Sequence, residues 1–97
     1  MRKEKVYIAG KISGLDYEEV KKKFTDTHVY LLYLGLLPVT PIFLCKPHWN
    51  WWRCMAVCLW HLAKCDRIYF LPDWKDSKGA RIERGIAKLL NIKEFNP

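Results

Sequence analysis

The sequence of 97 residues contains no internal repeat, no low-complexity tract and no long uninterrupted apolar run. A helix that spans a bilayer needs ~20 consecutive apolar residues. The most apolar segment, residues 29–45, is shorter than this and is interrupted by Gly35, Pro38 and Pro41. We therefore expect no membrane contact and interpret the segment as a helix end, a stop at Gly35 and a buried strand closed by Pro41.

Two common nucleotide-binding signatures are also missing. The pattern G-x-G-x-x-G does not occur, and GKIS at residues 10–13 lacks the upstream glycine and the G-K-[ST] order of a P-loop. The sequence therefore predicts neither of these two ways of holding a nucleotide phosphate.

Cysteine occurs at positions 45, 54, 58 and 65, but in no C-x-x-C pair. Because the chain opens MRKEKVYI, without the apolar segment of a secretory signal, we expect a cytoplasmic protein with free thiols. Cys54, Cys58 and Cys65 share one helical stripe, where cysteine behaves as a small apolar residue. A metal site formed by these three residues and His61 is the alternative, but the spacing matches no common zinc motif. We expect neither a metal nor a cofactor.

The charge is strongly positive, with 17 Lys and Arg against 10 Asp and Glu and a formal net charge of +7. The hydrophobic fraction of 51% predicts one folded domain over residues 1–97 rather than a disordered chain. Such a charge suits anionic ligands such as phosphates, or a nucleic-acid surface. The basic residues are spread out, however, and we interpret the run at 21–23 as a solvated helix face. A nucleic-acid partner is therefore not expected.

Strand and helix patterns alternate along the chain. The predicted strands are residues 5–9, 36–40, 67–71 and 92–95, and the predicted helices are about 16–34, 51–64 and 79–90. This order predicts an α/β fold, a small Rossmann/flavodoxin-like three-layer sandwich with a parallel sheet of about four strands and helices on both faces. We expect the last helix to bury Ile82, Ile86 and Leu89 or Leu90.

Two loops occupy the place where such sheets bind ligands, beyond the carboxyl ends of the strands. They are GKISG at residues 10–14, after the first strand, and PDWKDSKG at 72–79, after the third. We expect the two loops to be neighbours. Gly10 and Gly14 would let the backbone approach a ligand closely, although a purely structural turn explains them equally well.

The second loop leads into a helix start that is suited to bind an anion. Ser77 has the side chain of an N-cap, and the amides around Gly79 and Ala80 would attract a phosphate or a sugar hydroxyl. Arg81 either reinforces this charge or forms a surface salt bridge. Glu83 follows one turn later, and on an ordinary helix it would face solvent and pair with a basic side chain.

The two end segments of the chain resemble a known family. YIAGKISG at residues 7–14 and CDRIYFLPDWKDSKGARIERGIA at 65–87 are similar to the small DUF4406 proteins of bacteria and phages. Those proteins look like compact relatives of the nucleoside 2-deoxyribosyltransferases and the deoxynucleoside 5'-monophosphate N-glycosidases. The resemblance covers nearly the whole chain and implies an enzyme that acts on a nucleoside or nucleotide.

The resemblance also implies roles for individual residues. It makes Glu83 the counterpart of a catalytic glutamate that attacks the anomeric carbon of deoxyribose, and Ser77 the counterpart of a contact to sugar or phosphate. A second acid should protonate the departing base. The nearby candidates are Asp73, Asp76 and Asp66. The residues that would lie against the nucleoside are Tyr7 and the turn Gly10, Lys11, Ser13 and Gly14.

Two positions depart from the family pattern. Lys11 replaces the proline of the usual YIAGP and adds a positive charge that favours a phosphate. Cys58 stands where relatives commonly have an aspartate that contacts sugar or base, and a thiol cannot replace a carboxylate as a proton carrier. A non-catalytic nucleotide-binding protein is therefore the alternative to the enzyme.

A third hypothesis is a nucleic-acid-binding module in which tryptophans stack on bases, although core packing or a subunit interface is the commoner fate of this residue. The tryptophans are Trp49, Trp51, Trp52, Trp60 and Trp74. We expect a homodimer, because so small a sheet protein with this many aromatic residues buries some of them between subunits, and because relatives look oligomeric.

Overall fold

The computed structural model describes residues 3–12, 14–46 and 48–95. The strands are β1 (Lys5–Ala9), β2 (Leu37–Val39), β3 (Arg67–Phe70) and β4 (Lys93–Glu94). The helices are α1 (Tyr17–Tyr33), α2 (Pro41–Leu44), α3 (Trp51–Leu62) and α4 (Lys78–Leu89), with a short 3-10 helix η1 (Trp74–Asp76) before α4. The predicted alternation of strands and helices is confirmed, and α2 and η1 are additions that the sequence pattern did not indicate.

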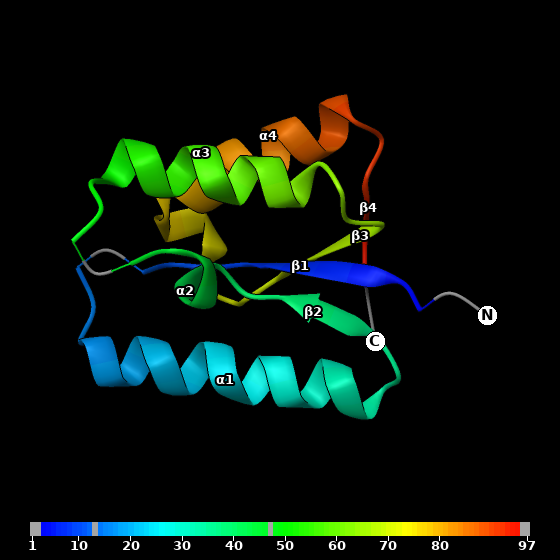
Figure 1. Cartoon of the computed structure of the whole chain (residues 1–97), viewed down its shortest axis with the longest axis horizontal. Coiled ribbons are helices and arrows are strands. Elements are labelled where there is room, and N and C mark those ends of the chain that lie inside the picture. The colour runs from blue at the N-terminus through cyan, green and yellow to red at the C-terminus, as the bar shows by residue number, and fades with distance from the viewer. Residues whose placement is uncertain (1–2, 13, 47, 96–97) are drawn as a thin grey trace.

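The four strands form one parallel sheet in the order β2-β1-β3-β4. Figure 1 shows α1 on one face of this sheet and α3 and α4 on the other. The predicted fold class is therefore confirmed: the chain is a small Rossmann/flavodoxin-like α/β sandwich of three layers.

Alternation along β1 divides the core into two layers, as expected for a strand that is covered on both faces. Val6 and Ile8 belong to the layer that contains Phe24 of α1. Tyr7 and Ala9 point to the opposite face and belong to the layer under α3 and α4. These four side chains of β1 are fully buried, so β1 is the central strand on which both helical layers rest.

Local signals in the sequence fix the ends of the helices. The Asp16 carboxylate accepts a hydrogen bond from the Glu19 amide, and Ser77 Oγ accepts one from the Ala80 amide at 3.1 Å, so both residues act as N-caps. Gly35 lies two residues after the end of α1 and has φ +84°, and the Leu36 amide donates to the Leu31 carbonyl. This pattern ends a helix with a glycine in the left-handed region, which other residues adopt at a cost.

The buried face of α4 differs from the prediction. Leu89 is 80% exposed and Leu90 is 47% exposed. Ile82 is also exposed, and Ile86 is only partly buried. The residues that α4 buries are Ala80, Glu83 and Ala87. Ala80 and Ala87 pack in the core cluster that contains Tyr7 and Ile68 of the sheet, whereas the larger aliphatic side chains at 82, 89 and 90 are exposed.

The cysteines do not all remain free thiols, contrary to our expectation. Cys45 and Cys54 form a disulfide, whereas Cys58 and Cys65 are free and buried. The reason is α2, because this short helix places Cys45 opposite the first turn of α3. Of the metal-site set considered from the sequence, Cys65 lies apart: its thiol donates a hydrogen bond to the carbonyl of His61.

Within the described residues, none of the helices combines the length and the apolar character needed to cross a bilayer. Apolar side chains are nevertheless exposed at the end of α1 and the start of β2. They are Val29, Tyr30, Leu32, Tyr33, Leu34 and Leu37. A homodimer stays a prediction, and this is the surface that we expect it to bury.

Gly10, directly after β1, packs against Leu71, which follows β3. This close contact should make the stability of the protein sensitive to substitution of Gly10. A Cβ atom at position 10 would lie 2.5 Å from Leu71 Cδ1 and 3.0 Å from Leu71 Cβ. We expect Gly10→Ala to lower the free energy of unfolding by about 1–3 kcal/mol, the usual effect of overpacking a core. Urea denaturation measures it.

Gly85→Ala is the matched control, because a Cβ at this position in α4 meets no atom within 4 Å. It should raise the free energy of unfolding by up to about 1 kcal/mol, since alanine is the better helix former. Equal stability of Gly10→Ala and the parent protein would show that β1 and β3 do not require this close approach.

Candidate functional site

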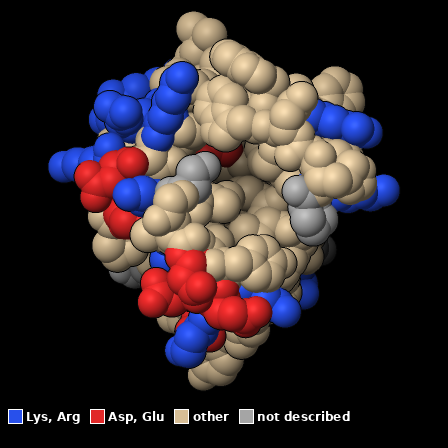
Figure 2. Space-filling model, turned by 90° about the vertical axis from the view of Figure 1, so that its left-hand side faces the viewer, with Lys and Arg blue, Asp and Glu red and all other residues tan. Residues whose placement is uncertain are grey.

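A cavity of about 490 Å³ opens at the carboxyl ends of the strands. Figure 2 looks onto this end of the molecule and shows the hollow, with mostly uncharged residues around its mouth. One wall is the turn at residues 10–12 after β1, and a second consists of residues 76–80 and Glu83. The third wall comes from the segment between β2 and α3 and from α3 itself.

The strand order explains why the cavity forms here. The chain leaves β1 for β2 on one side and later returns to β3 on the other side of β1. Loops that leave two such neighbouring strands diverge to opposite faces, and the gap between them is the usual ligand crevice of open parallel sheets. The two loops that the sequence analysis singled out therefore lie side by side.

Glu83 is the most unusual side chain of this site. Its side chain can ionise, yet it is only 5% exposed, and it lines the cavity. The hydroxyl of Tyr7, which is fully buried on β1, donates a hydrogen bond to Glu83 Oε2. Burial raises the pKa of Glu83 to about 7, and the hydrogen bond from Tyr7 offsets part of this rise. Glu83 therefore titrates near neutral pH.

Tyr7 and Cys58 surround this carboxylate. Burial, and next the charge of Glu83, raises the pKa of Tyr7 well above 10, so Tyr7 keeps its proton and acts as a donor. The Cys58 thiol interacts with Tyr7, and burial raises its pKa to about 11. Cys58 is thus a neutral thiol that interacts with Tyr7, the residue that binds Glu83.

The start of α4 presents polar groups to the cavity. Ser77, Lys78, Gly79 and Ala80 all line it. The Ala80 amide at this helix end is not available to a ligand, because it donates a hydrogen bond to Ser77 Oγ. Asp76, the last residue of η1, is exposed and also lines the cavity. A helix start with an adjacent lysine suits a phosphate or another anion.

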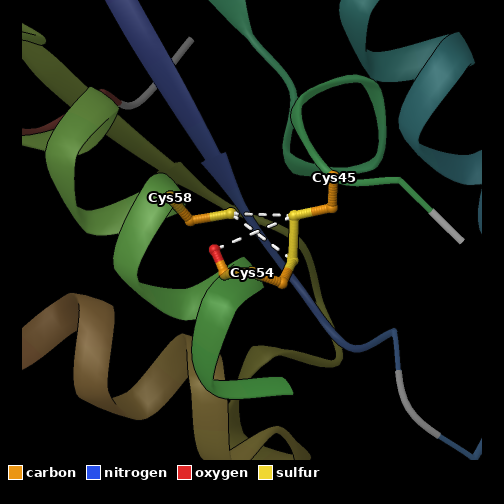
Figure 3. Close-up of side chains that lie close together, drawn as sticks. All are labelled: Cys45, Cys54 and Cys58. Atoms are coloured by element: carbon orange, nitrogen blue, oxygen red, sulfur yellow. Dashed lines mark hydrogen bonds between the residues drawn. A yellow bond between two sulfur atoms is a disulfide. The ribbon is translucent and has the colours of Figure 1, made fainter. Parts of the chain in front are cut away.

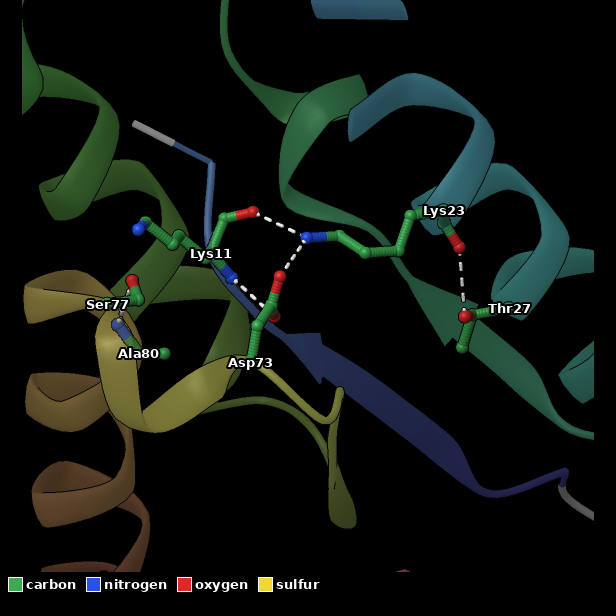
Figure 4. Close-up of polar contacts among 6 residues, drawn as sticks. All are labelled: Lys11, Lys23, Thr27, Asp73, Ser77 and Ala80. Carbon is green, nitrogen blue, oxygen red and sulfur yellow. Dashed lines mark hydrogen bonds and ion pairs between the residues drawn. The ribbon is translucent and has the colours of Figure 1, made fainter. Parts of the chain in front are cut away.

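Asp73 has a different environment from Glu83. Its carboxylate accepts hydrogen bonds from Lys23 Nζ at 2.5 Å and from the Lys11 amide at 3.1 Å, and Lys23 Nζ also donates to the Lys11 carbonyl (Figure 4). Burial by itself would raise the pKa of Asp73, but these hydrogen bonds and the charge of Lys23 outweigh it and hold the pKa below its ordinary value. Asp73 therefore anchors the turn after β1, while the Lys11 side chain points away from this pair.

The third wall of the cavity was not predicted from the sequence. It carries Trp49 and Trp51, whose rings lie under Arg53 and Lys78 at 4.3 and 5.2 Å from the cationic groups. The indole N–H of Trp49 is buried and has no hydrogen-bond partner among the described residues. The segment could have been found, because it follows the carboxyl end of β2 and so belongs to the same edge of the sheet as the other two loops.

The predicted site residues fall into three groups. Glu83, Asp76, Gly10, Lys11, Ser77, Gly79 and Ala80 line the cavity. Tyr7 lies behind Glu83, Asp73 supports the turn, and Gly14 and Arg81 are exposed residues outside the cavity lining. Ser13 lies outside the described residues.

Comparison with protein-family profiles identifies the family of the chain. No curated protein matches the chain. The sequence profile described as Domain of unknown function (DUF4406) matches residues 4–94, which include the sheet, all four helices and every described residue of the cavity wall. The chain therefore belongs to the DUF4406 family.

Proposed function

We propose that the protein cleaves the N-glycosidic bond of a nucleoside or nucleotide, by deoxyribosyl transfer or by hydrolysis, with Glu83 as the nucleophile. The observation that carries this proposal is the position of Glu83, a buried carboxylate at the wall of a cavity that the turn after β1 also lines. A carboxylate in this position can stabilise a cation-like sugar and form a covalent bond with its anomeric carbon. The resemblance to deoxyribosyltransferases and N-glycosidases supports the same role.

The charges around the cavity favour a ligand with a phosphate group. Lys11, Lys46 and Lys78 line the cavity, and the start of α4 adds its free amides. We therefore infer that a deoxynucleoside 5'-monophosphate binds more tightly than the nucleoside. Trp49 and Trp51 offer aromatic faces for the base, and a ligand oxygen would provide the missing partner of the Trp49 indole N–H.

The reaction begins with attack of the Glu83 carboxylate on the anomeric carbon. A bond forms between a Glu83 oxygen and this carbon, and the bond to the base nitrogen breaks with its electron pair passing to the base. The base takes up a proton, and water or a second base then displaces Glu83 from the sugar. Tyr7 donates to the Glu83 oxygen throughout and so holds the carboxylate in one orientation.

Asp76 is our candidate for the group that protonates the departing base. It is the other acid among the described residues that line the cavity. Asp73, the second candidate from the sequence, is bound to Lys23 and to the Lys11 amide, so we assign it to the support of the turn. Cys58 carries no charge beside Tyr7 and supplies no proton in this scheme.

A non-catalytic nucleotide-binding protein is the second candidate. Cys58 favours it, because a buried neutral thiol occupies the position where the resemblance predicts an aspartate. Such a protein would hold the nucleotide in the same cavity through the lysines and aromatic rings, and would leave the glycosidic bond intact.

One experiment separates the two candidates. The protein is incubated with each deoxynucleoside and each deoxynucleoside 5'-monophosphate, with and without a second base as acceptor, and the free base and the exchanged product are measured by chromatography while thermal stabilisation reports binding. Free base from a monophosphate supports the enzyme. Thermal stabilisation with unchanged nucleotide supports the binding protein, and the absence of both effects contradicts both candidates.

A further inference from the structure

Three cysteine side chains converge on the wall of the cavity (Figure 3). Cys54 and Cys58 lie four residues apart on one face of α3, and Cys45 faces them from the end of α2. Cys58 Sγ is 3.7 Å from Cys45 Sγ and 3.9 Å from Cys54 Sγ. All three sulfur atoms lie within 4.8 Å of one another, as the donor atoms of one metal site would.

These sulfur–sulfur distances are those of a tetrahedral zinc site. Zn–S bonds of about 2.3 Å at a tetrahedral angle place two sulfur ligands about 3.8 Å apart. Cys58 already has this separation from both of its partners. Cys45 and Cys54 must separate to reach it, and rotation about a Cα–Cβ bond moves a sulfur atom without moving the backbone.

We propose that Cys45, Cys54 and Cys58, in their reduced form, bind a thiophilic divalent cation of the zinc class. Three thiolates form a soft ligand set that selects such an ion over magnesium or calcium. Because all three cysteines line the cavity, the fourth coordination position faces the cavity and is filled by water or by an atom of a ligand. The site does not depend on the function proposed above.

The charge around the cavity suits this ion. A divalent cation with three thiolates carries a net charge of −1, and positive side chains nearby offset it. Lys11, Lys46 and Lys78 line the same cavity.

The disulfide between Cys45 and Cys54 is the oxidised, metal-free state of the same site. A dithiol reductant opens it: two electrons and two protons pass from the dithiol, the S–S bond breaks into two thiols, and the dithiol itself becomes a disulfide. The cation then replaces the thiol protons, which pass to solvent. A structural disulfide needs only two cysteines. The sulfur of Cys58, which lies at the ligand–ligand distance of a zinc site from Cys45 and Cys54, is what points to a metal.

Zinc titration of the reduced, untagged protein tests the proposal. The disulfide is first reduced without oxygen by a phosphine, which takes up the oxygen of a water molecule as two thiols form. Zn²⁺ is then titrated in competition with a chromophoric chelator, and Co²⁺ serves as a spectroscopic probe. We expect one equivalent of zinc, cobalt spectra typical of tetrahedral thiolate coordination, and no binding by the oxidised protein.

Variants separate this cluster from buried thiols in general. Cys58→Ser should weaken zinc binding by at least about a hundredfold. Cys45→Ser should weaken zinc binding to the same degree. Because Cys45 is only half-buried, this variant tests the cluster even if Cys58→Ser misfolds. Cys65→Ser is the matched control, because Cys65 is a free buried thiol outside the cluster. The proposal fails if the reduced parent protein binds no zinc, or if all three variants bind it equally well.

Discussion

Replacing Glu83 by glutamine should stop base release while nucleotide binding persists. Glutamine has nearly the same shape and can still accept the hydrogen bond from Tyr7, but it cannot form the covalent bond to the sugar. We expect the rate of base release from a deoxynucleoside 5'-monophosphate to fall at least about a thousandfold, as is typical when a nucleophile is removed. Single-turnover kinetics with chromatographic detection of the free base measures this change.

Glu94→Gln is the matched control, because Glu94 undergoes the same chemical change on the exposed strand β4. It should leave both the rate and the binding unchanged. Thermal stabilisation by the nucleotide should be as large for Glu83→Gln as for the parent protein. A Glu83→Gln variant that releases base at the parental rate would exclude Glu83 as the nucleophile, whatever reaction the cavity performs.

The fold was predictable because strand and helix signals in this chain are local. Residues 6–9 form a continuous apolar and aromatic run that ends at a glycine, and together with Lys5 they are β1 with the predicted bounds. Ser77 acts as the N-cap of α4, and Gly35 follows the end of α1 in the left-handed region, both as expected. These signals depend on neighbours in the sequence and need no knowledge of tertiary contacts.

The burial of α4 was not predictable in the same way. Hydrophobicity favours an inward orientation of Ile82 and Leu89, yet the structure buries Ala80, Glu83 and Ala87. The buried face carries two alanines of the core cluster around Tyr7 and a carboxyl group that is hydrogen-bonded to Tyr7. An apolar pattern shows neither small core side chains nor a hydrogen-bonded carboxyl group, so it does not indicate this face.

The site was predictable for two of its walls. Parallel-sheet geometry places the loops after β1 and β3 together, and the cavity lies between them. The tryptophan wall was missed although its position after β2 predicts it, and the full cysteine cluster was missed because Cys45 joins it only through α2, a helix of four residues. So short a helix gives no periodic pattern.

The stability of the protein should fall as the pH rises from about 4.5 to about 7. The pKa of Glu83 is 4.5 in its ordinary state and about 7 in the folded protein, so the folded state holds the proton more tightly. Below both values the carboxyl group is neutral in either state. As the pH rises, the unfolded chain releases its proton first, and folding is then penalised by the burial of the group.

The size of this effect follows from the two pKa values. Each pKa unit corresponds to about 1.4 kcal/mol, so ionisation of Glu83 should lower the free energy of unfolding by roughly 3 kcal/mol at pH 8 relative to pH 4.5. Urea denaturation across this range measures it. Glu83→Gln carries no titrating group, so the difference in stability between variant and parent should grow in favour of the variant as the pH rises. A difference that does not change with pH would contradict the raised pKa.

Catalysis and stability should respond to this ionisation in opposite directions. The nucleophile is the carboxylate, so kcat/KM for base release should rise through a pH of about 7, over the same range in which the folded state loses stability. The proton on Glu83 thus favours the folded structure, and its loss favours the reaction. A rising limb of the pH–rate profile that coincides with the falling limb of the pH–stability profile would assign both effects to one buried carboxyl group. Two limbs at different pH values would require a second titrating group in the cavity.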